Sequence, residues 1–109
     1  MIIKKPSIFI YAYQPDVSVL KDVCAGIEEE GVFYEMKEME NASSDELAWA
    51  AANDSMLGSG IGMNGRSIAL QMRGIPKGRS IEGYLEPNQE QARKLGANSA
   101  RAIKKLPFK

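Results

Sequence analysis

The stretch GSGIGMNGRSIALQM, residues 58–72, decides how the sheet of this protein is arranged. Asn64-Gly65 is the dipeptide most typical of a tight β-hairpin, because both residue types tolerate the positive φ that such turns require. The segments 58–63 and 66–72 on either side are therefore predicted to be neighbouring antiparallel strands. The alternating glycines at positions 58, 60 and 62 favour a short buried strand with a helix packed closely over it.

The same glycines also invite comparison with phosphate-binding loops, and the comparison fails on two points. No lysine follows them as a P-loop requires. Met63 stands where the dinucleotide-binding fingerprint has its last glycine. A nucleotide site is therefore not expected in this stretch, and the glycines are assigned to packing.

Strands and helices alternate before this hairpin. The run Ser7–Tyr13 is dense in β-branched and aromatic residues and predicts a strand covered on both faces. Asp16 is placed to cap a helix that ends at Gly31. The apolar stripe of this helix is predicted to consist of Val17, Leu20, Cys24 and Ile27.

A second strand and a second helix come next. Val32–Glu38 predicts the strand, and Ser43 with Glu46 matches the capping box of a helix that runs through Ala52. Trp49 lies off the apolar stripe of this helix. It is predicted either to pack at the edge of the core or to present an aromatic face to another protein.

A strand and a helix complete the pattern. Ser80–Leu85 predicts the strand, and Pro87 opens a helix that runs toward Leu106. The inner face of this helix is predicted to comprise Ala92, Leu95, Gly96, Ser99 and Ile103. The order β-α-β-α-β-β-β-α predicts an α/β protein, a three-layer α/β/α fold with a mixed five-stranded sheet and one antiparallel strand. Residues 1–109 are expected to form a single domain.

Composition argues against several classes of function. Lys and Arg together number 14 and Asp and Glu together number 14, so no overall field attracts nucleic acid or an anionic membrane. The chain has no histidine, which excludes His-based catalysis and imidazole metal ligands. Cys24, the single cysteine, is expected in the core. The start, MIIKKPSIFIYAY, is too short and too soon polar for a signal peptide or membrane span, so a soluble cytoplasmic protein is expected.

Three carboxylates close the first helix in the segment GIEEEG, residues 26–31. Anions near a helix C-terminus are disfavoured by about 0.3–1 kcal/mol each when exposed. Because successive helical residues turn by about 100°, Glu28, Glu29 and Glu30 are not expected to converge on one ion, and Glu29 is predicted to point most directly outward. Such a carboxylate suits a magnesium site completed by a partner, since Mg²⁺ accepts oxygens from separate sources. The alternative is a solvated acidic turn.

Basic residues gather in the last part of the sequence, at Arg93, Lys94, Arg101, Lys104, Lys105 and Lys109. A cationic helix face can follow the phosphates of a nucleic acid, contact an acidic protein surface or simply be solvated. Nearby glutamates and the lack of interleaved exposed aromatic residues argue against nucleic acid. The solvated face is the simplest interpretation.

Three stretches taken together resemble a known family. They are GIEEEG (26–31), AWAA (48–51) leading to Gly60-Ile61-Gly62, and NSAR (98–101) leading to Leu106-Pro107-Phe108. In this order and at these separations they resemble the small subunit of the diol/glycerol dehydratase reactivating factor, over nearly the whole chain. Two departures are the lack of a proline in Gly31–Tyr34 and Asn64 in place of an acidic residue.

The resemblance implies a fold like that of the dehydratase medium subunit and of anticodon-binding domains, and a non-catalytic role. It implies two alternate partners, a large ATPase subunit and the dehydratase large subunit. Exchange with the medium subunit would release damaged cobalamin from an adenosylcobalamin-dependent dehydratase. No cofactor of its own is expected, but Glu29 would help to hold a Mg²⁺ ion shared with the ATPase subunit. Glu28, Glu29, Glu30 and Trp49 are assigned to the partner interface.

Two other functions stay open at this point. Mixed α/β/α domains of this size also bind tRNA anticodon regions, so a small nucleic-acid-binding module is the main alternative. A small enzyme acting through convergent carboxylates is the other. The sequence leaves open whether the client enzyme handles a diol or glycerol, and whether the protein is enclosed in a bacterial microcompartment.

Overall fold

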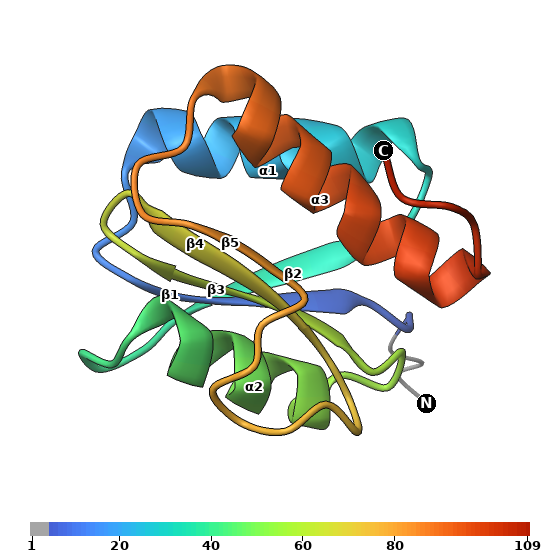
Figure 1. Ribbon diagram of the computed structural model, residues 1–109, viewed down its shortest axis with the longest axis horizontal. Coiled ribbons are helices and arrows are strands. Elements are labelled where there is room, and N and C mark those ends of the chain that lie inside the picture. The colour runs from blue at the N-terminus through green and yellow to red at the C-terminus, as the bar shows by residue number, and fades with distance from the viewer. Residues whose placement is uncertain (1–4) are drawn as a thin grey trace.

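The chain alternates strands and helices, then adds two more strands and a last helix (Figure 1). The structure is a computed structural model and describes residues 5–109. Residues 1–4, part of the opening stretch judged too short for a signal peptide, lie outside the described residues. The elements are β1 (Ile8–Tyr13), α1 (Val17–Glu29), β2 (Tyr34–Glu38), α2 (Ser44–Asp54), β3 (Ser59–Asn64), β4 (Ser67–Met72), β5 (Glu82–Tyr84) and α3 (Gln89–Lys104).

The strands form one sheet in the order β2-β1-β3-β4-β5. β1 pairs parallel with both β2 and β3, whereas β4 pairs antiparallel with β3 and β5. α1 and α3 lie side by side on one face of the sheet and α2 lies on the other (Figure 1). The prediction of a three-layer fold with one antiparallel strand is therefore confirmed.

The glycines of β3 have the packing role that the sequence predicts. A Cβ on Gly60 would lie 2.1 Å from the Ala52 nitrogen, and one on Gly62 would lie 1.9 Å from the Ser44 carbonyl oxygen. Both contacts are with the backbone of α2, so any side chain at these positions would push α2 away from the sheet. The close packing of a helix over this strand is confirmed.

The hairpin between β3 and β4 forms, but its turn lies one residue later than the Asn-Gly signal suggests. Asn64 still pairs with Ser67, so Gly65 and Arg66 are the two central residues of the turn. Gly65 adopts φ +58, which only glycine and a few polar residues take readily. The Asn64 side chain instead donates to the Ala42 carbonyl oxygen at 2.9 Å and ties the turn to the segment that precedes α2.

The buried face of α1 differs from the predicted stripe. Asp16 caps the helix as predicted, since its Oδ1 accepts from the Ser18 and Val19 nitrogens. Val17 is 80% exposed, however, while Val19 and Val23 are buried with Ile27. Leu20 and Cys24 are only partly buried. The prediction was wrong because α1 is covered by α3 as well as by the sheet, and this turns the helix toward Val19 and Val23.

α3 crosses α1 at close range through one glycine on each helix. A Cβ on Gly26 would lie 2.0 Å from the Arg93 carbonyl oxygen, and one on Gly96 would lie 2.0 Å from the Val23 carbonyl oxygen. α3 begins after the N-cap Asn88, slightly later than the predicted start at Pro87. It ends where Lys105 turns to φ +58. The predicted inner face is confirmed except that Ile103 is only partly buried.

Two strands are shorter than predicted, and both lie at the edges of the sheet. β2 begins at Tyr34 and its side chains are mostly exposed, and β5 is reduced to three residues. An edge strand has one neighbour, so pairing ends earlier there than in the middle of the sheet. Within residues 5–109, no helix is long and apolar enough to cross a membrane.

Candidate functional site

The three glutamates at the end of α1 all have partners within the chain. Glu28 Oε1 accepts a hydrogen bond of 2.6 Å from the Tyr34 hydroxyl. This hydrogen bond is the main reason why the pKa of Tyr34 is raised. Glu29 pairs with Arg93, and Glu30 pairs with Arg101. The carboxylates therefore do not form the solvated acidic turn that the sequence left open as the alternative.

Glu29 is held by cations on both of its carboxylate oxygens. The Arg93 guanidinium contacts Oε1 through Nε and Nη2. The Lys109 ammonium lies 3.6 Å from Oε2. The hydrogen bond from Arg93, together with the charges of Arg93 and Lys109, lowers the pKa of Glu29, so this carboxyl group stays ionised at neutral pH. Its side chain is 33% exposed and lies against α3.

Glu30 is more enclosed than Glu29, with a side chain that is only 10% exposed. Its Oε2 accepts from Arg101 Nε at 3.2 Å and lies 3.9 Å from Lys109 Nζ. Its backbone oxygen accepts from Lys104. One ammonium group, that of Lys109, therefore bridges the carboxylates of Glu29 and Glu30. The expectation that Glu28, Glu29 and Glu30 do not all converge on one ion agrees with this arrangement, because Glu28 turns away to Tyr34 while Glu29 and Glu30 share Lys109.

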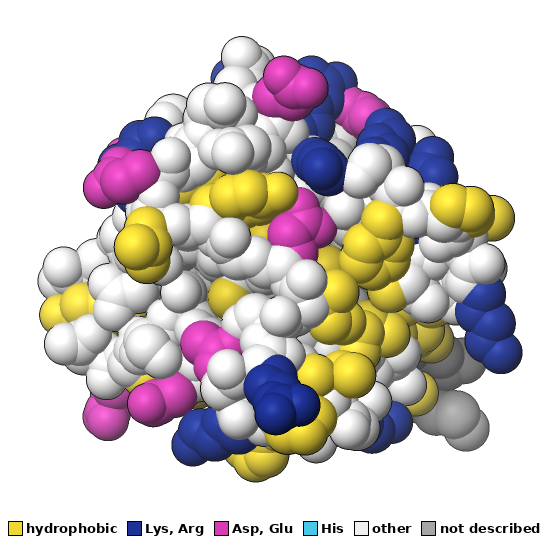
Figure 2. All heavy atoms as spheres, viewed as in Figure 1, with side chains coloured by type: hydrophobic (Ala, Val, Ile, Leu, Met, Phe, Trp, Pro, Cys, Tyr) yellow, Lys and Arg dark blue, Asp and Glu magenta, His cyan; other side chains and the backbone are white. Residues whose placement is uncertain are grey.

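These contacts explain why carboxylates stand at an unfavourable helix end. Cations from α3 and the segment after it offset the negative end of α1 and the three added charges. Figure 2 shows Lys and Arg side chains gathered at the upper right, around the C-terminal end of the chain, with acidic side chains among them. The residues that make these contacts are Arg93, Arg101, Lys104 and Lys109. The interpretation of the basic residues as a solvated face holds for all but the partly buried Arg101, and four of them also pair with the end of α1, which the sequence did not predict.

The segment after α3 folds back and places Lys109 in this cluster. The Lys109 backbone nitrogen donates to Asn98 Oδ1 at 2.8 Å, and Arg101 Nη1 donates to the Pro107 carbonyl oxygen at 2.9 Å. Asn98 is itself buried, and its Nδ2 donates to Glu82 Oε1. A hollow of about 310 Å³ opens beside the cluster and is lined by Glu29, Glu90, Arg93, Lys94 and Lys109. The cluster is therefore ordered and still open to solvent.

The carboxylates suit a shared metal ion better than a metal centre within this chain. Among residues 5–109, no group of three or more His, Cys, Asp or Glu side chains is placed to hold a metal ion. Carboxylate oxygens are the donors that Mg²⁺ prefers, and the ion accepts one or two of them with the rest supplied by water or another molecule. Glu29 and Glu30 could supply such oxygens, provided that a partner completed the site.

Trp49 does not lie with the glutamates. It is on α2, and the sheet separates α2 from α1 and α3 (Figure 1). The ring is partly buried, and Lys77 Nζ lies 5.3 Å from its centroid. Of the four residues predicted for a partner interface, the structure therefore brings together Glu28, Glu29 and Glu30 and leaves Trp49 on the opposite layer.

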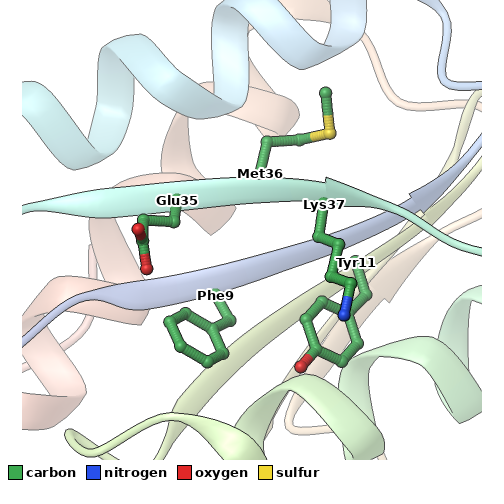
Figure 3. A pocket seen from close by; sticks show the side chains of 5 residues that line it. All are labelled: Phe9, Tyr11, Glu35, Met36 and Lys37. Atoms are coloured by element: carbon green, nitrogen blue, oxygen red, sulfur yellow. The ribbon is translucent and has the colours of Figure 1, made fainter.

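A second hollow, which sequence reasoning missed, lies on the α2 face of the sheet. α2 packs mainly on β3, β4 and β1, and the adjoining part of the face forms a hollow of about 350 Å³. Figure 3 shows Phe9, Tyr11, Glu35 and Lys37 on this face, with Met36 pointing the other way. The Phe9 and Tyr11 rings stack at 6.0 Å. The aromatic residues at alternate positions of β1 were the feature of the sequence that could have indicated this hollow.

The strand β1 is thus less completely covered than the sequence predicts, since Phe9 and Tyr13 are only partly buried. Within the hollow the Tyr11 hydroxyl donates to Asp54 Oδ2 at 2.6 Å. Burial, followed by this hydrogen bond, raises the pKa of Tyr11 to about 12. Its hydroxyl is therefore neutral at ordinary pH, and its role here is to tie β1 to the end of α2.

Comparison with known proteins places the chain in a family. The family described as dehydratase medium subunit matches residues 5–109. The propanediol dehydratase-reactivating factor small subunit of Citrobacter freundii is 31% identical, over 95% of this chain and 90% of that protein. A probable glycerol dehydratase-reactivating factor small subunit of the same species is 32% identical, over 93% of this chain and 89% of that protein.

A solved structure agrees with these relatives. In the structure of diol dehydratase-reactivating factor complexed with ADP and Mg²⁺, one chain matches with a TM-score of 0.90 and 25% identity, covering 97% of this chain and 99% of that one. Both the resemblance seen in the sequence and the predicted fold are confirmed. The chain therefore belongs to the dehydratase medium-subunit family, as a small subunit of the diol or glycerol dehydratase-reactivating-factor type.

Proposed function

We propose that this chain is a non-catalytic, single-domain adaptor in an ATP-dependent factor that reactivates a coenzyme-B12-dependent diol or glycerol dehydratase. By taking the place of the dehydratase medium subunit, it loosens the enzyme so that damaged cobalamin leaves. The observation that carries this proposal is the match of residues 5–109 to the medium-subunit family, combined with relatives that are reactivating-factor small subunits. A chain with the fold of the subunit that it replaces can use the same surface of the enzyme.

The partners follow from this role. A small subunit of a reactivating factor implies a larger partner subunit. We assign ATP hydrolysis to that large subunit, and the ADP and Mg²⁺ in the related solved complex support nucleotide binding within such an assembly. The dehydratase large subunit is the alternate partner. The protein acts in the cytoplasm, and enclosure in a microcompartment is a separate question.

Glu29 is the residue that we assign to the Mg²⁺ ion shared with the large subunit. Its carboxylate fits the ion in donor chemistry, and the hydrogen bond from Arg93, which lowers its pKa, favours the ionised form further. Glu28 and Glu30 flank it on the same surface and belong to the same interface. Trp49 belongs to a separate contact on the α2 side.

Co-purification with a large subunit of a reactivating factor tests the proposal. Wild-type protein, Glu29→Gln and Glu90→Gln are compared in Mg²⁺ and in chelator. Glu90 lines the same hollow and serves as the charge-matched control. We expect a complex that weakens in chelator and with Glu29→Gln but not with Glu90→Gln.

The outcomes separate the role of the protein from the role of the residue. A complex that is indifferent to both Glu29→Gln and chelator would refute the metal role and keep the adaptor. If the protein bound neither the ATPase subunit nor the dehydratase large subunit, the proposed adaptor role would be refuted. In that case a gel shift at low salt would test the nucleic-acid alternative.

A further inference from the structure

We propose that the Lys109 ammonium competes with a divalent cation for Glu29 and Glu30. This inference rests on the metal role proposed for Glu29, adds Glu30 as a second carboxylate and identifies an internal competitor. In the free subunit Lys109 occupies the position between the two carboxylates, so that a metal ion binds well only when a partner contributes further oxygens.

The two carboxylate oxygens of Glu29 contact different cations. Arg93 binds Oε1 of Glu29 and leaves Oε2 to Lys109. Lys109 Nζ lies 3.6 Å from that Oε2 and 3.9 Å from Oε2 of Glu30. The two Oε2 atoms therefore already face one shared cation. Because an ion taking this place uses Oε2, it can leave Arg93 bound to Oε1.

Arg101 does not block this position. It donates to Glu30 Oε2 at 3.2 Å, but a carboxylate oxygen has two lone pairs and can accept a hydrogen bond while it contacts a cation. A metal ion and the Lys109 ammonium group are both cations, and they cannot occupy the same position between the two Oε2 atoms. Binding of the metal ion therefore requires the Lys109 side chain to leave.

The Lys109 side chain is free to make this exchange. Both of its distances exceed those of a close charge-assisted hydrogen bond, which are about 2.7–2.9 Å. The side chain is 43% exposed and borders the open hollow. The backbone of Lys109 is anchored separately, through its nitrogen to Asn98. The ammonium can therefore swing into solvent while the segment after α3 stays in place.

Paramagnetic broadening of the isolated subunit tests the competition without any partner. Mn²⁺ is titrated into ¹⁵N-labelled protein at physiological salt, and the backbone signals of residues 28–31 are followed. For Lys109→Gln we expect half-broadening at about two- to fivefold lower Mn²⁺ than for wild type, in line with the strength of a partly exposed ion pair. Lys94→Gln removes the same charge from the same hollow. Within residues 5–109 Lys94 forms no ion pair, whereas Lys109 contacts both carboxylates, so this variant should change the Mn²⁺ sensitivity much less than Lys109→Gln.

Three results would overturn the proposal. One is equal Mn²⁺ sensitivity of Lys109→Gln and wild type. Another is an equal shift in Lys94→Gln, which would indicate a general charge effect. The third is broadening that persists when Glu29→Gln is added to Lys109→Gln, because the ion would then bind elsewhere.

Complex formation with the large subunit, measured for the same variants as a function of Mg²⁺ concentration, connects the competition to function. Lys109→Gln should reach half-maximal complex with the large subunit at lower Mg²⁺ than wild type, and an unchanged Mg²⁺ requirement would contradict the inference. If no complex forms with any variant, the proposed function fails, while the Mn²⁺ titration still decides the role of Lys109.

Discussion

Replacing Gly26 with alanine tests whether the close crossing of α1 and α3 builds the ionic cluster. A Cβ at this position would lie 2.0 Å from the Arg93 carbonyl oxygen and 2.8 Å from the Ala97 nitrogen. Both atoms belong to the α3 backbone, so no change of rotamer relieves the clash. Ordinary contact begins at 3.4 Å, so the helices must separate locally by about 1.4 Å.

The cost follows from two opposing effects. Overpacking of this kind costs roughly 1–3 kcal/mol. Alanine is a better helix former than glycine, and this offsets about 1 kcal/mol of the cost. Because both clashing atoms belong to the α3 backbone, the overpacking cost should lie in the upper part of that range, at about 2–3 kcal/mol. We therefore expect a net loss of stability of about 1–2 kcal/mol, which for a chain of this size lowers Tm by about 5–10 °C. The contacts of Glu29 with Arg93 and of Glu30 with Arg101 should lengthen, because they span the same two helices.

Thermal unfolding followed by circular dichroism measures this effect. Gly83→Ala is the matched control, since its Cβ would lie 3.4 Å from the nearest atom and should change Tm by no more than about 2–4 °C. A Tm for Gly26→Ala at or above that of wild type would refute the reasoning. So would an equal fall in both variants, because the loss would then not come from the helix crossing.

Two further predictions concern α3. Asn88→Ala removes the capping box in which Asn88 Oδ1 accepts from the Gln91 nitrogen at 2.7 Å, and it should cost about 0.5–2 kcal/mol in urea unfolding. An unchanged midpoint would contradict that role. Arg93→Gln should destabilise most at neutral pH. Arg93 lowers the folded-state pKa of Glu29, so its contribution is present above the unfolded-state pKa of about 4.3 and fades as pH falls through the folded-state value. An equal loss of stability at neutral and acid pH would show that Arg93 acts through packing.

Local chemistry made much of the backbone predictable. Asp16 and Ser43 cap their helices as expected, because an N-cap depends only on the next few residues. The glycines of β3 predicted that α2 packs closely on this strand, since a helix backbone can come so near only where the strand has no side chain. The turn after β3 was placed one residue early, because Asn64 uses its side chain to hold Ala42 and stays in the strand.

The candidate site was predictable in its residues and not in its contacts. The segment GIEEEG stood out because carboxylates are disfavoured at a helix C-terminus. Its partners could not be read from the sequence, since Arg93 lies 64 residues from Glu29 and Arg101 lies 71 residues from Glu30. The hollow beside Phe9 could not be predicted, because the sequence does not show how much of the sheet α2 covers.

The sequence by itself determined the order of the elements, the one antiparallel strand and the family, because these depend on turn chemistry, side-chain periodicity and local motifs. Only the tertiary structure decided which side of α1 is buried and which cations meet Glu29 and Glu30. Both depend on α3 crossing α1 at Gly26 and Gly96. That crossing is a contact between distant segments, and the spacing of residues within either helix does not encode it.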